Sequence, residues 1–171
     1  IFVANFTANP LSQIALTLSS NPISGGTAIG GGVYNMGTSV TVNANQFPGY
    51  DFINWTDQFT GNIISTSPGF TFVLNSNKNL VANYTIRKYT LNAIAVNGSI
   101  TKNPNQIDYT HGTNVQLTAV PKTGYSFTSW SGDTAASSNP LTIKMISDKS
   151  ITANFTAIPP ATYTLNITSN N

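Results

Sequence analysis

Two tryptophans stand out among the residues that could bind a ligand. Trp55 follows Tyr50 by five residues, and Trp130 follows Tyr125 at the same spacing. Aromatic rings stack on the C–H-rich faces of sugars, so this spacing is compatible with a glycan-binding surface. A tryptophan also buries up to ~250 Å² and usually anchors the core of a small domain, and we favour that interpretation. Trp55 and Trp130 are therefore primarily core candidates and secondarily candidates for glycan stacking.

Few residues could support metal binding or catalysis. His111 is the single histidine, and without cysteine, glutamate or a second histidine one imidazole cannot build a zinc site. Asp57 and Asp133 follow the tryptophans, but calcium requires about six to eight oxygen ligands, and the sequence has no aspartate-rich loop. It also lacks a Gly-x-Ser-x-Gly elbow and a converging pair of carboxylates. We therefore predict turn residues at these positions, no catalytic residue, no metal, no cofactor and no enzyme activity.

Asparagine glycosylation is the remaining chemistry that the residues suggest. Six Asn-x-Ser/Thr sequons occur, at Asn5, Asn54, Asn83, Asn97, Asn154 and Asn166. Asn154 alternates with Ala153 and Phe155, so we expect its side chain to face solvent and to be able to carry a glycan. A chain rich in Asn and Thr also produces sequons by chance and copies them by duplication. Both interpretations stay open.

The elements that must position these residues are repeated along the chain. The segment VANYT at 81–85 returns as TANFT at 152–156 and as VANFT at 3–7. The segment GYDF at 49–52 likewise returns as GYSF at 124–127. Together these matches give a period of about 75 residues. We divide the chain into the last strand of a preceding repeat (1–7), two repeat domains (8–85 and 86–157), and a linker with the first strand of a following repeat (158–171). The chain is therefore expected to be a segment of a longer array.

Each repeat is predicted to be all-β. Apolar residues occupy alternate positions at 40–44, 70–74, 80–84, 115–119, 141–145 and 151–156. Clusters of Gly, Pro and Asn separate these segments, and Asn97-Gly98 is a strong hairpin signal. No segment has the i, i+3, i+4, i+7 spacing of an amphipathic helix. We predict about six short strands per repeat, in small tandem β-sandwich or β-grasp-like domains without significant helix.

Aromatic residues in these strands give two sharper expectations. Tyr84 and Phe155 occupy equivalent places in the best alternating strand, so both rings are predicted to be buried. Tyr125 and Phe127 are two positions apart and would point to the same face of a regular strand, whereas Trp130, three positions after Phe127, would point to the opposite face. Either a β-bulge or a change of face must therefore separate Phe127 from Trp130.

Several spaced motifs of the second repeat together resemble one known family. They are Tyr89-Thr90-Leu91, Gly98-Ser99-Ile100, Gly124-Tyr125-Ser126-Phe127, Trp130-Ser131-Gly132-Asp133 and the segment 148–155. As a set they are similar to the divergent internalin-B-type repeats of long bacterial and archaeal surface proteins. The first repeat follows more loosely, with Thr56-Asp57 after its tryptophan and a four-residue insertion before Lys78. The resemblance implies an extracellular, tandemly repeated β module that has no catalytic residues of its own.

Composition favours an exported protein. Only 7% of residues are charged, Glu is absent, and Asn, Ser and Thr make up about a third of the chain, whereas globular proteins average about a quarter charged residues. The net charge of +2 is scattered, which argues against nucleic acid or a membrane surface as a partner. No run approaches the ~20 apolar residues of a membrane span. Without cysteine, the stability of each domain must come from packing.

We therefore predict a non-catalytic structural segment of an extracellular or cell-surface stalk, fibre or adhesin. The alternative is a carbohydrate-binding module, and an accessory domain of a secreted hydrolase is a third class. The single strands at 1–7 and 163–169 would leave backbone groups unpaired. We expect them to pair with neighbouring repeats or with copies of the chain. Surface glycans are a further candidate partner.

Overall fold

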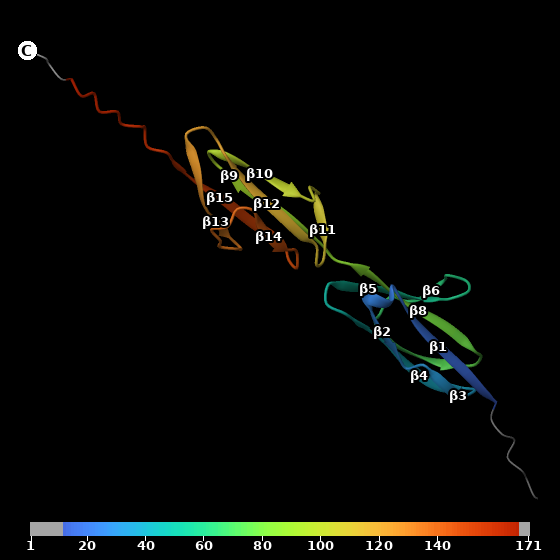
Figure 1. The fold of residues 1–171 in the computed structure, drawn as a ribbon. Coiled ribbons are helices and arrows are strands. Elements are labelled where there is room, and N and C mark those ends of the chain that lie inside the picture. The colour runs from blue at the N-terminus through green and yellow to red at the C-terminus, as the bar shows by residue number, and fades with distance from the viewer. Residues whose placement is uncertain (1–11, 168–171) are drawn as a thin grey trace, which may run out of the picture. The chain divides into compact units, whose positions relative to one another are not determined.

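The chain folds into two compact units, the first ending at Arg87 and the second beginning at Lys88 (Figure 1). The structure is a computed structural model and describes residues 12–167. The predicted strand at 1–7 and the sequon at Asn5 lie outside these residues. Within them, each unit consists of β-strands and turns, with one short 3-10 segment, η1 (Ile23–Gly25), in the first unit. The all-β prediction is confirmed.

The first unit has eight strands in two sheets. The larger sheet has the order β3-β1-β8-β5-β6, and the smaller one has the order β2-β4-β7. Their bounds are β1 (Gln13–Asn21), β2 (Gly26–Ile29), β3 (Gly32–Asn35), β4 (Thr38–Gln46), β5 (Tyr50–Asp57), β6 (Ile63–Ser65), β7 (Gly69–Leu74) and β8 (Lys78–Ile86).

The second unit repeats this arrangement with seven strands. Its sheets have the orders β11-β9-β15-β13 and β10-β12-β14. An isolated bridge between Trp130 and Ala136 stands where the first unit has β6. The bounds are β9 (Lys88–Ala95), β10 (Gly98–Asn103), β11 (Asp108–Thr110), β12 (Asn114–Pro121), β13 (Tyr125–Gly132), β14 (Leu141–Lys144) and β15 (Lys149–Ala157).

The core of each unit lies between its two sheets. In the first unit Val40 and Val42 of the smaller sheet pack in one cluster with Leu80 and Ala82 of the larger sheet. In the second unit the equivalent cluster joins Val115 and Leu117 of the smaller sheet to Ile151 and Ala153 of the larger sheet. Alternate residues of a strand point to opposite faces, so the apolar parity found in the sequence becomes the inner face of each sheet. This is a sandwich. A β-grasp arrangement would need a helix, and residues 12–167 contain no α-helix.

The first and last strands of each unit are parallel neighbours. β1 runs beside β8, with Leu16 opposite Lys78 and Asn21 opposite Asn83. β9 runs beside β15 in the same way. Because parallel strands point in one direction, the chain enters each unit at one end of the larger sheet and leaves it at the opposite end.

β-bulges account for the parity of the tryptophans. The pairing of β13 with β15 slips by one residue between Phe127 and Ser129, and the pairing of β5 with β8 slips between Phe52 and Asn54. The extra residue turns Phe127 and Trp130 towards the same core, where their ring centroids lie 5.3 Å apart. The bulge alternative is confirmed.

The prediction for the last strand holds for Tyr84 but is wrong for Phe155. Tyr84 is buried, whereas Phe155 is only half-buried. The corner formed by Gly25 and Gly26 lies directly against the Tyr84 ring, while Phe155 meets Gly98 in the second unit. The second unit has no counterpart of η1 at this corner, so its aromatic ring keeps one side open to solvent.

Candidate functional site

Both tryptophans belong to the cores. Trp55 and Trp130 are 0% and 1% exposed. Their indole Nε1 atoms donate hydrogen bonds to the carbonyl oxygens of Pro68 (3.0 Å) and Ser138 (2.9 Å). These bonds satisfy the one polar atom that burial of an indole would otherwise leave without a partner. Neither ring presents a face to solvent, so glycan stacking on Trp55 or Trp130 is not available in this fold.

The asparagines of the last strands are bonded rather than free. Asn83 Nδ2 donates to Asn54 Oδ1 (2.9 Å) and Thr56 Oγ1 (3.0 Å), and Asn154 Nδ2 donates to the hydroxyls of Ser129 (3.1 Å) and Ser131 (3.0 Å). Both side chains are half-buried. Both lie on the outward parity that the sequence predicted, but their amides are hydrogen-bonded and partly covered rather than fully open to solvent. Each sits just beyond the bulge of the neighbouring strand, and its amide bridges the two polar residues that the bulge leaves on the outer face.

The remaining described sequons differ in accessibility. Asn54 is half-buried and accepts the hydrogen bond from Asn83. Asn97 is exposed in the turn between β9 and β10, with a backbone φ of 67°, in the left-handed region that asparagine tolerates. Asn166 is exposed as well. Asn97 and Asn166 are thus the described sequons whose side-chain amides are accessible to a glycosylating enzyme.

The two aspartates that follow the tryptophans act differently from each other. Asp57 caps its turn, because its Oδ1 accepts hydrogen bonds from the backbone N–H groups of Thr60 (2.9 Å) and Phe59 (3.0 Å). These bonds favour the carboxylate and lower the pKa of Asp57. Asp133 instead accepts from the backbone N–H of Ser150 (2.7 Å), so it joins its loop to the start of β15. The turn-cap prediction is confirmed for Asp57 and corrected for Asp133.

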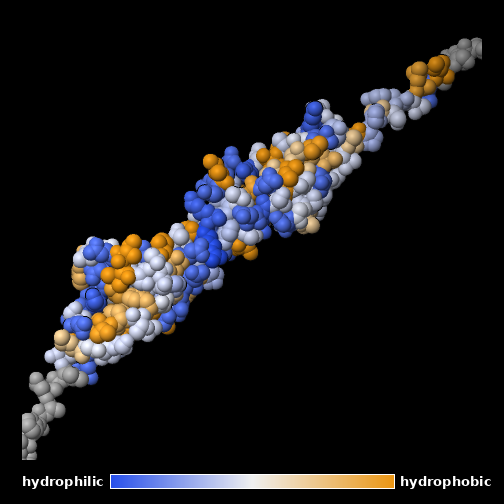
Figure 2. Space-filling model, turned by 180° about the vertical axis from the view of Figure 1, so that it is seen from behind, coloured by the Kyte–Doolittle hydropathy of each residue, from blue (hydrophilic) through white to orange (hydrophobic). Residues whose placement is uncertain are grey.

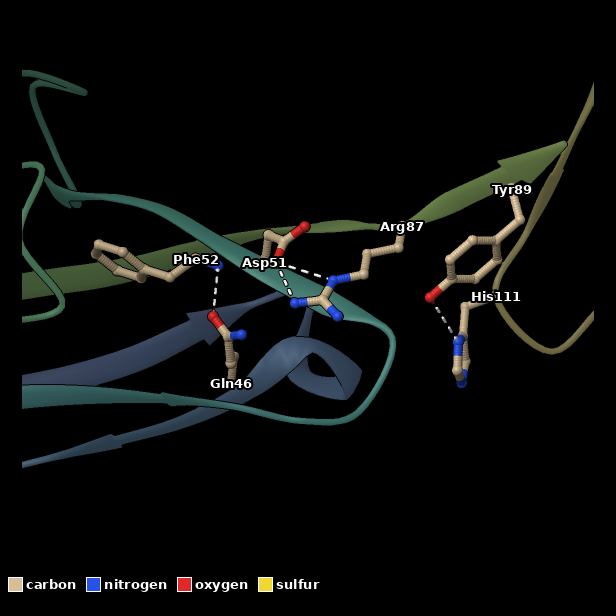
Figure 3. Close-up of polar contacts among 6 residues, drawn as sticks. All are labelled: Gln46, Asp51, Phe52, Arg87, Tyr89 and His111. Carbon is tan, nitrogen blue, oxygen red and sulfur yellow. Dashed lines mark hydrogen bonds and ion pairs between the residues drawn. The ribbon is translucent and has the colours of Figure 1, made fainter. Parts of the chain in front are cut away.

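His111 lies in the turn between β11 and β12, as predicted. Its Nδ1 is 3.4 Å from the hydroxyl oxygen of Tyr89 (Figure 3). In the first unit, Arg87 donates from Nε (2.9 Å) and Nη2 (2.6 Å) to Asp51 Oδ1, which lowers the pKa of Asp51 (Figure 3). Residues 12–167 contain no cluster of three or more His, Cys, Asp or Glu side chains that could hold a metal ion.

One polar feature that the sequence reasoning missed joins the first and last strands. Asp148 Oδ1 accepts hydrogen bonds from the backbone N–H (2.7 Å) and hydroxyl (3.0 Å) of Thr90, which lower the pKa of Asp148. In the first unit Asn77 Oδ1 accepts from the backbone N–H of Ala15 (2.8 Å). We call these contacts the strand latches. The signal for them was present, since Asn77 and Asp148 directly precede the equivalent residues Lys78 and Lys149.

Comparison with protein families matches the divergent InlB B-repeat domain twice, over residues 16–88 and 89–159. The chain belongs to this family. Each B-repeat domain corresponds to one sandwich, because the two matches meet between Lys88 and Tyr89, at the start of β9 and within two residues of the end of β8. Comparison with curated proteins and with solved structures finds no match. Among the described residues, no helix of a B-repeat domain is long and apolar enough to cross a membrane.

Proposed function

We propose that the two B-repeat domains are a load-bearing spacer in the stalk, fibre or adhesin shaft of an extracellular protein. The observation that carries this proposal is the parallel pairing of the first and last strand in each domain. A spacer must transmit tension along the chain. The strands that receive the tension are the ones that continue into the rest of the chain.

The register of the first and last strands gives the distance between the points where the chain enters and leaves each domain. From Gln13 to Asn21 the chain advances eight residues, Asn21 lies level with Asn83, and three more residues lead to Ile86. Eleven residues at ~3.3 Å each place the entry and exit about 36 Å apart along the sheet. The second domain gives the same eleven residues, seven from Lys88 to Ala95 and four from Ala153 to Ala157.

Tension applied at the two ends pulls the first and last strands past each other along their length. In this geometry the hydrogen bonds between the strands carry the load together, whereas strands that separate from one end break their bonds one after another. The strand latches add side-chain bonds to the same pair of strands, from Asn77 in one domain and Asp148 in the other. Hydrogen bonds to a charged group are the stronger kind, so the Asp148 latch is expected to resist more than the Asn77 latch.

Composition supports the location outside the cell. The chain has no cysteine and only 7% charged residues, so both domains depend on packed apolar cores and on hydroxyl and amide surfaces. Such a surface keeps its properties over a wide range of ionic strength and pH, because few of its groups titrate or are screened. These are conditions that a surface protein meets.

Force spectroscopy of the chain, held at its two ends, tests the proposal. We expect two discrete unfolding events, each releasing about 200–230 Å, which is the extended length of the 74 residues from Gln13 to Ile86 minus about 36 Å. Asp148→Ala should lower the force of one event and leave the other unchanged, and Asn166→Ala is the matched control. Gradual extension without discrete peaks, or peaks that Asp148→Ala does not alter, would contradict a load-bearing role.

A further inference from the structure

The turn between β9 and β10 contains the one Asn-Gly pair of the chain, Asn97-Gly98. Asparagine followed by glycine is prone to spontaneous loss of its side-chain amide, because a glycine without Cβ lets its backbone nitrogen approach the asparagine side chain. The reaction needs no enzyme and no cofactor. In a folded protein it requires that both the side-chain amide and the glycine nitrogen are free.

The side chain of Asn97 is open to solvent. Within residues 12–167 its amide takes part in no hydrogen bond, in contrast to the amides of Asn83 and Asn154. The preceding Val96 is 70% exposed, and it is one of several apolar residues that reach the surface of the two units (Figure 2). A shallow hollow lined by Asn97, Gly98 and the residues opposite them gives water access to the turn.

The backbone nitrogen of Gly98 is not used by the sheet. The N–H of Lys122 donates to the carbonyl oxygen of Asn97 (3.0 Å), and the next pair along the ladder is Gly98 opposite Pro121. Hydrogen-bonded and non-hydrogen-bonded pairs alternate in an antiparallel ladder, so Gly98 and Pro121 form a non-hydrogen-bonded pair. The N–H of Gly98 therefore points away from β12. Because β10 is an edge strand, no described strand lies on that side to accept it.

We propose that Asn97 is a site of spontaneous conversion to isoaspartate. The backbone nitrogen of Gly98 attacks Cγ of Asn97, the new N–Cγ bond closes a succinimide ring, and the Cγ–Nδ2 bond breaks. Nδ2 leaves as ammonia with the proton that the Gly98 nitrogen gives up. Water then opens the ring. Opening at the α-carbonyl carbon yields isoaspartate, in which the main chain runs through Cβ and Cγ, and opening at Cγ yields aspartate.

The second unit has little room to absorb this change. A Cβ added at Gly98 would lie 2.5 Å from the Phe155 ring and 2.7 Å from the carbonyl oxygen of Val120, so the backbone of Gly98 packs directly against both. Isoaspartate lengthens the main chain by one carbon just before this contact and adds a carboxylate. Closely packed sites tolerate little displacement. The contact with Phe155 therefore has to loosen, and the second unit loses stability as isoaspartate accumulates.

The first unit lacks this site. Its corresponding connection, between β1 and β2, consists of Pro22 and η1, and no asparagine there precedes a glycine. The conversion therefore acts on one of the two units, and the first unit serves as an internal reference. The proposal goes beyond the spacer role and does not depend on it, because the reaction requires only the turn and its water access.

Peptide mapping of aged protein tests the reaction. The chain is produced in a host without asparagine glycosylation, since a glycan on Asn97 would occupy Nδ2, and it is kept folded at mildly alkaline pH. The tryptic peptide 89–102 also contains Asn92, which is exposed but precedes Ala93 and donates its amide to Ser150 Oγ (3.4 Å). We expect isoaspartate to form at Asn97 at least tenfold faster than at Asn92. Equal rates at the two positions would overturn the proposal.

Urea denaturation of the aged protein provides the second test. In a Trp55→Phe background, the fluorescence of Trp130 reports on the second unit alone, and we expect its urea midpoint to fall as isoaspartate accumulates. Asn97→Gly is the matched control, because glycine accepts the φ of 67° and has no side-chain amide to lose. Its midpoint should stay constant. A midpoint that falls equally in the control, or that stays constant while isoaspartate accumulates, would overturn the proposed effect on the second unit and leave the spacer role untouched.

Discussion

Replacing Trp130 with alanine should remove at least about a third of the stability of the second unit. The indole is 1% exposed, packs against Phe127 at a centroid distance of 5.3 Å, and donates its N–H to Ser138. Truncating a buried tryptophan to alanine costs about 3–5 kcal/mol. A unit of ~70 residues has a total unfolding free energy of about 3.5–10 kcal/mol, at ~0.05–0.15 kcal/mol per residue. The variant should thus lose a third or more of that free energy.

Urea denaturation of the whole chain measures this loss. Circular dichroism follows both units, and the fluorescence of Trp55 reports on the first unit alone in the variant. With a slope of about 1 kcal/mol per molar urea, the transition of the second unit should move by about 3 M or more and can vanish. The Trp55 transition should not move, because the core cluster of Trp55 contains only residues of the first unit.

A milder substitution separates packing from hydrogen bonding. Trp130→Phe keeps an aromatic ring but removes the donor to Ser138, so it should cost only about 1–2 kcal/mol. If Trp130→Ala costs less than about 1 kcal/mol, the indole is not a core residue in solution. Glycan stacking would then again be open at this position, and titration with polysaccharides would have to be examined.

Three further outcomes are expected. Tyr84→Ala should destabilise its unit more than Phe155→Ala destabilises the other, by roughly 1–2 kcal/mol, because only Tyr84 is fully covered; equal losses in melting experiments would contradict the difference in burial. Asn154→Ala should cost about 1–2 kcal/mol through its two lost hydrogen bonds, and an unchanged midpoint in urea would show that the amide bridge is not formed. The pKa of Asp148 is lowered in the folded unit, so its stabilising contribution is present above the unfolded pKa of about 3.9 and is lost as pH falls through the folded value. Stability measured against pH should therefore fall below about pH 4, and Asp148→Asn should flatten that fall, whereas an identical pH profile would contradict the latch.

The structure also shows why some site predictions could not be made from the sequence. The outward parity of Asn154 was inferred correctly, yet its amide is not free. The partners Ser129 and Ser131 are more than 20 residues away, and the bulge between Phe127 and Ser129 brings them alongside. A bulge adds one residue without a distinctive sequence, so its effect on neighbouring side chains becomes visible only once the strands are paired.

The sequence alone determined the repeat, the β class and most of the core. Those properties depend on alternation and periodicity, which are local and are copied from one repeat to the next. The tertiary structure decided which strands are neighbours, and with them the parallel pairing of β1 with β8 and the strand latches. These features join residues up to about 60 positions apart. The same alternation of apolar and polar residues is compatible with many strand orders. Which strands pair over long range therefore depends on how the two sheets pack together.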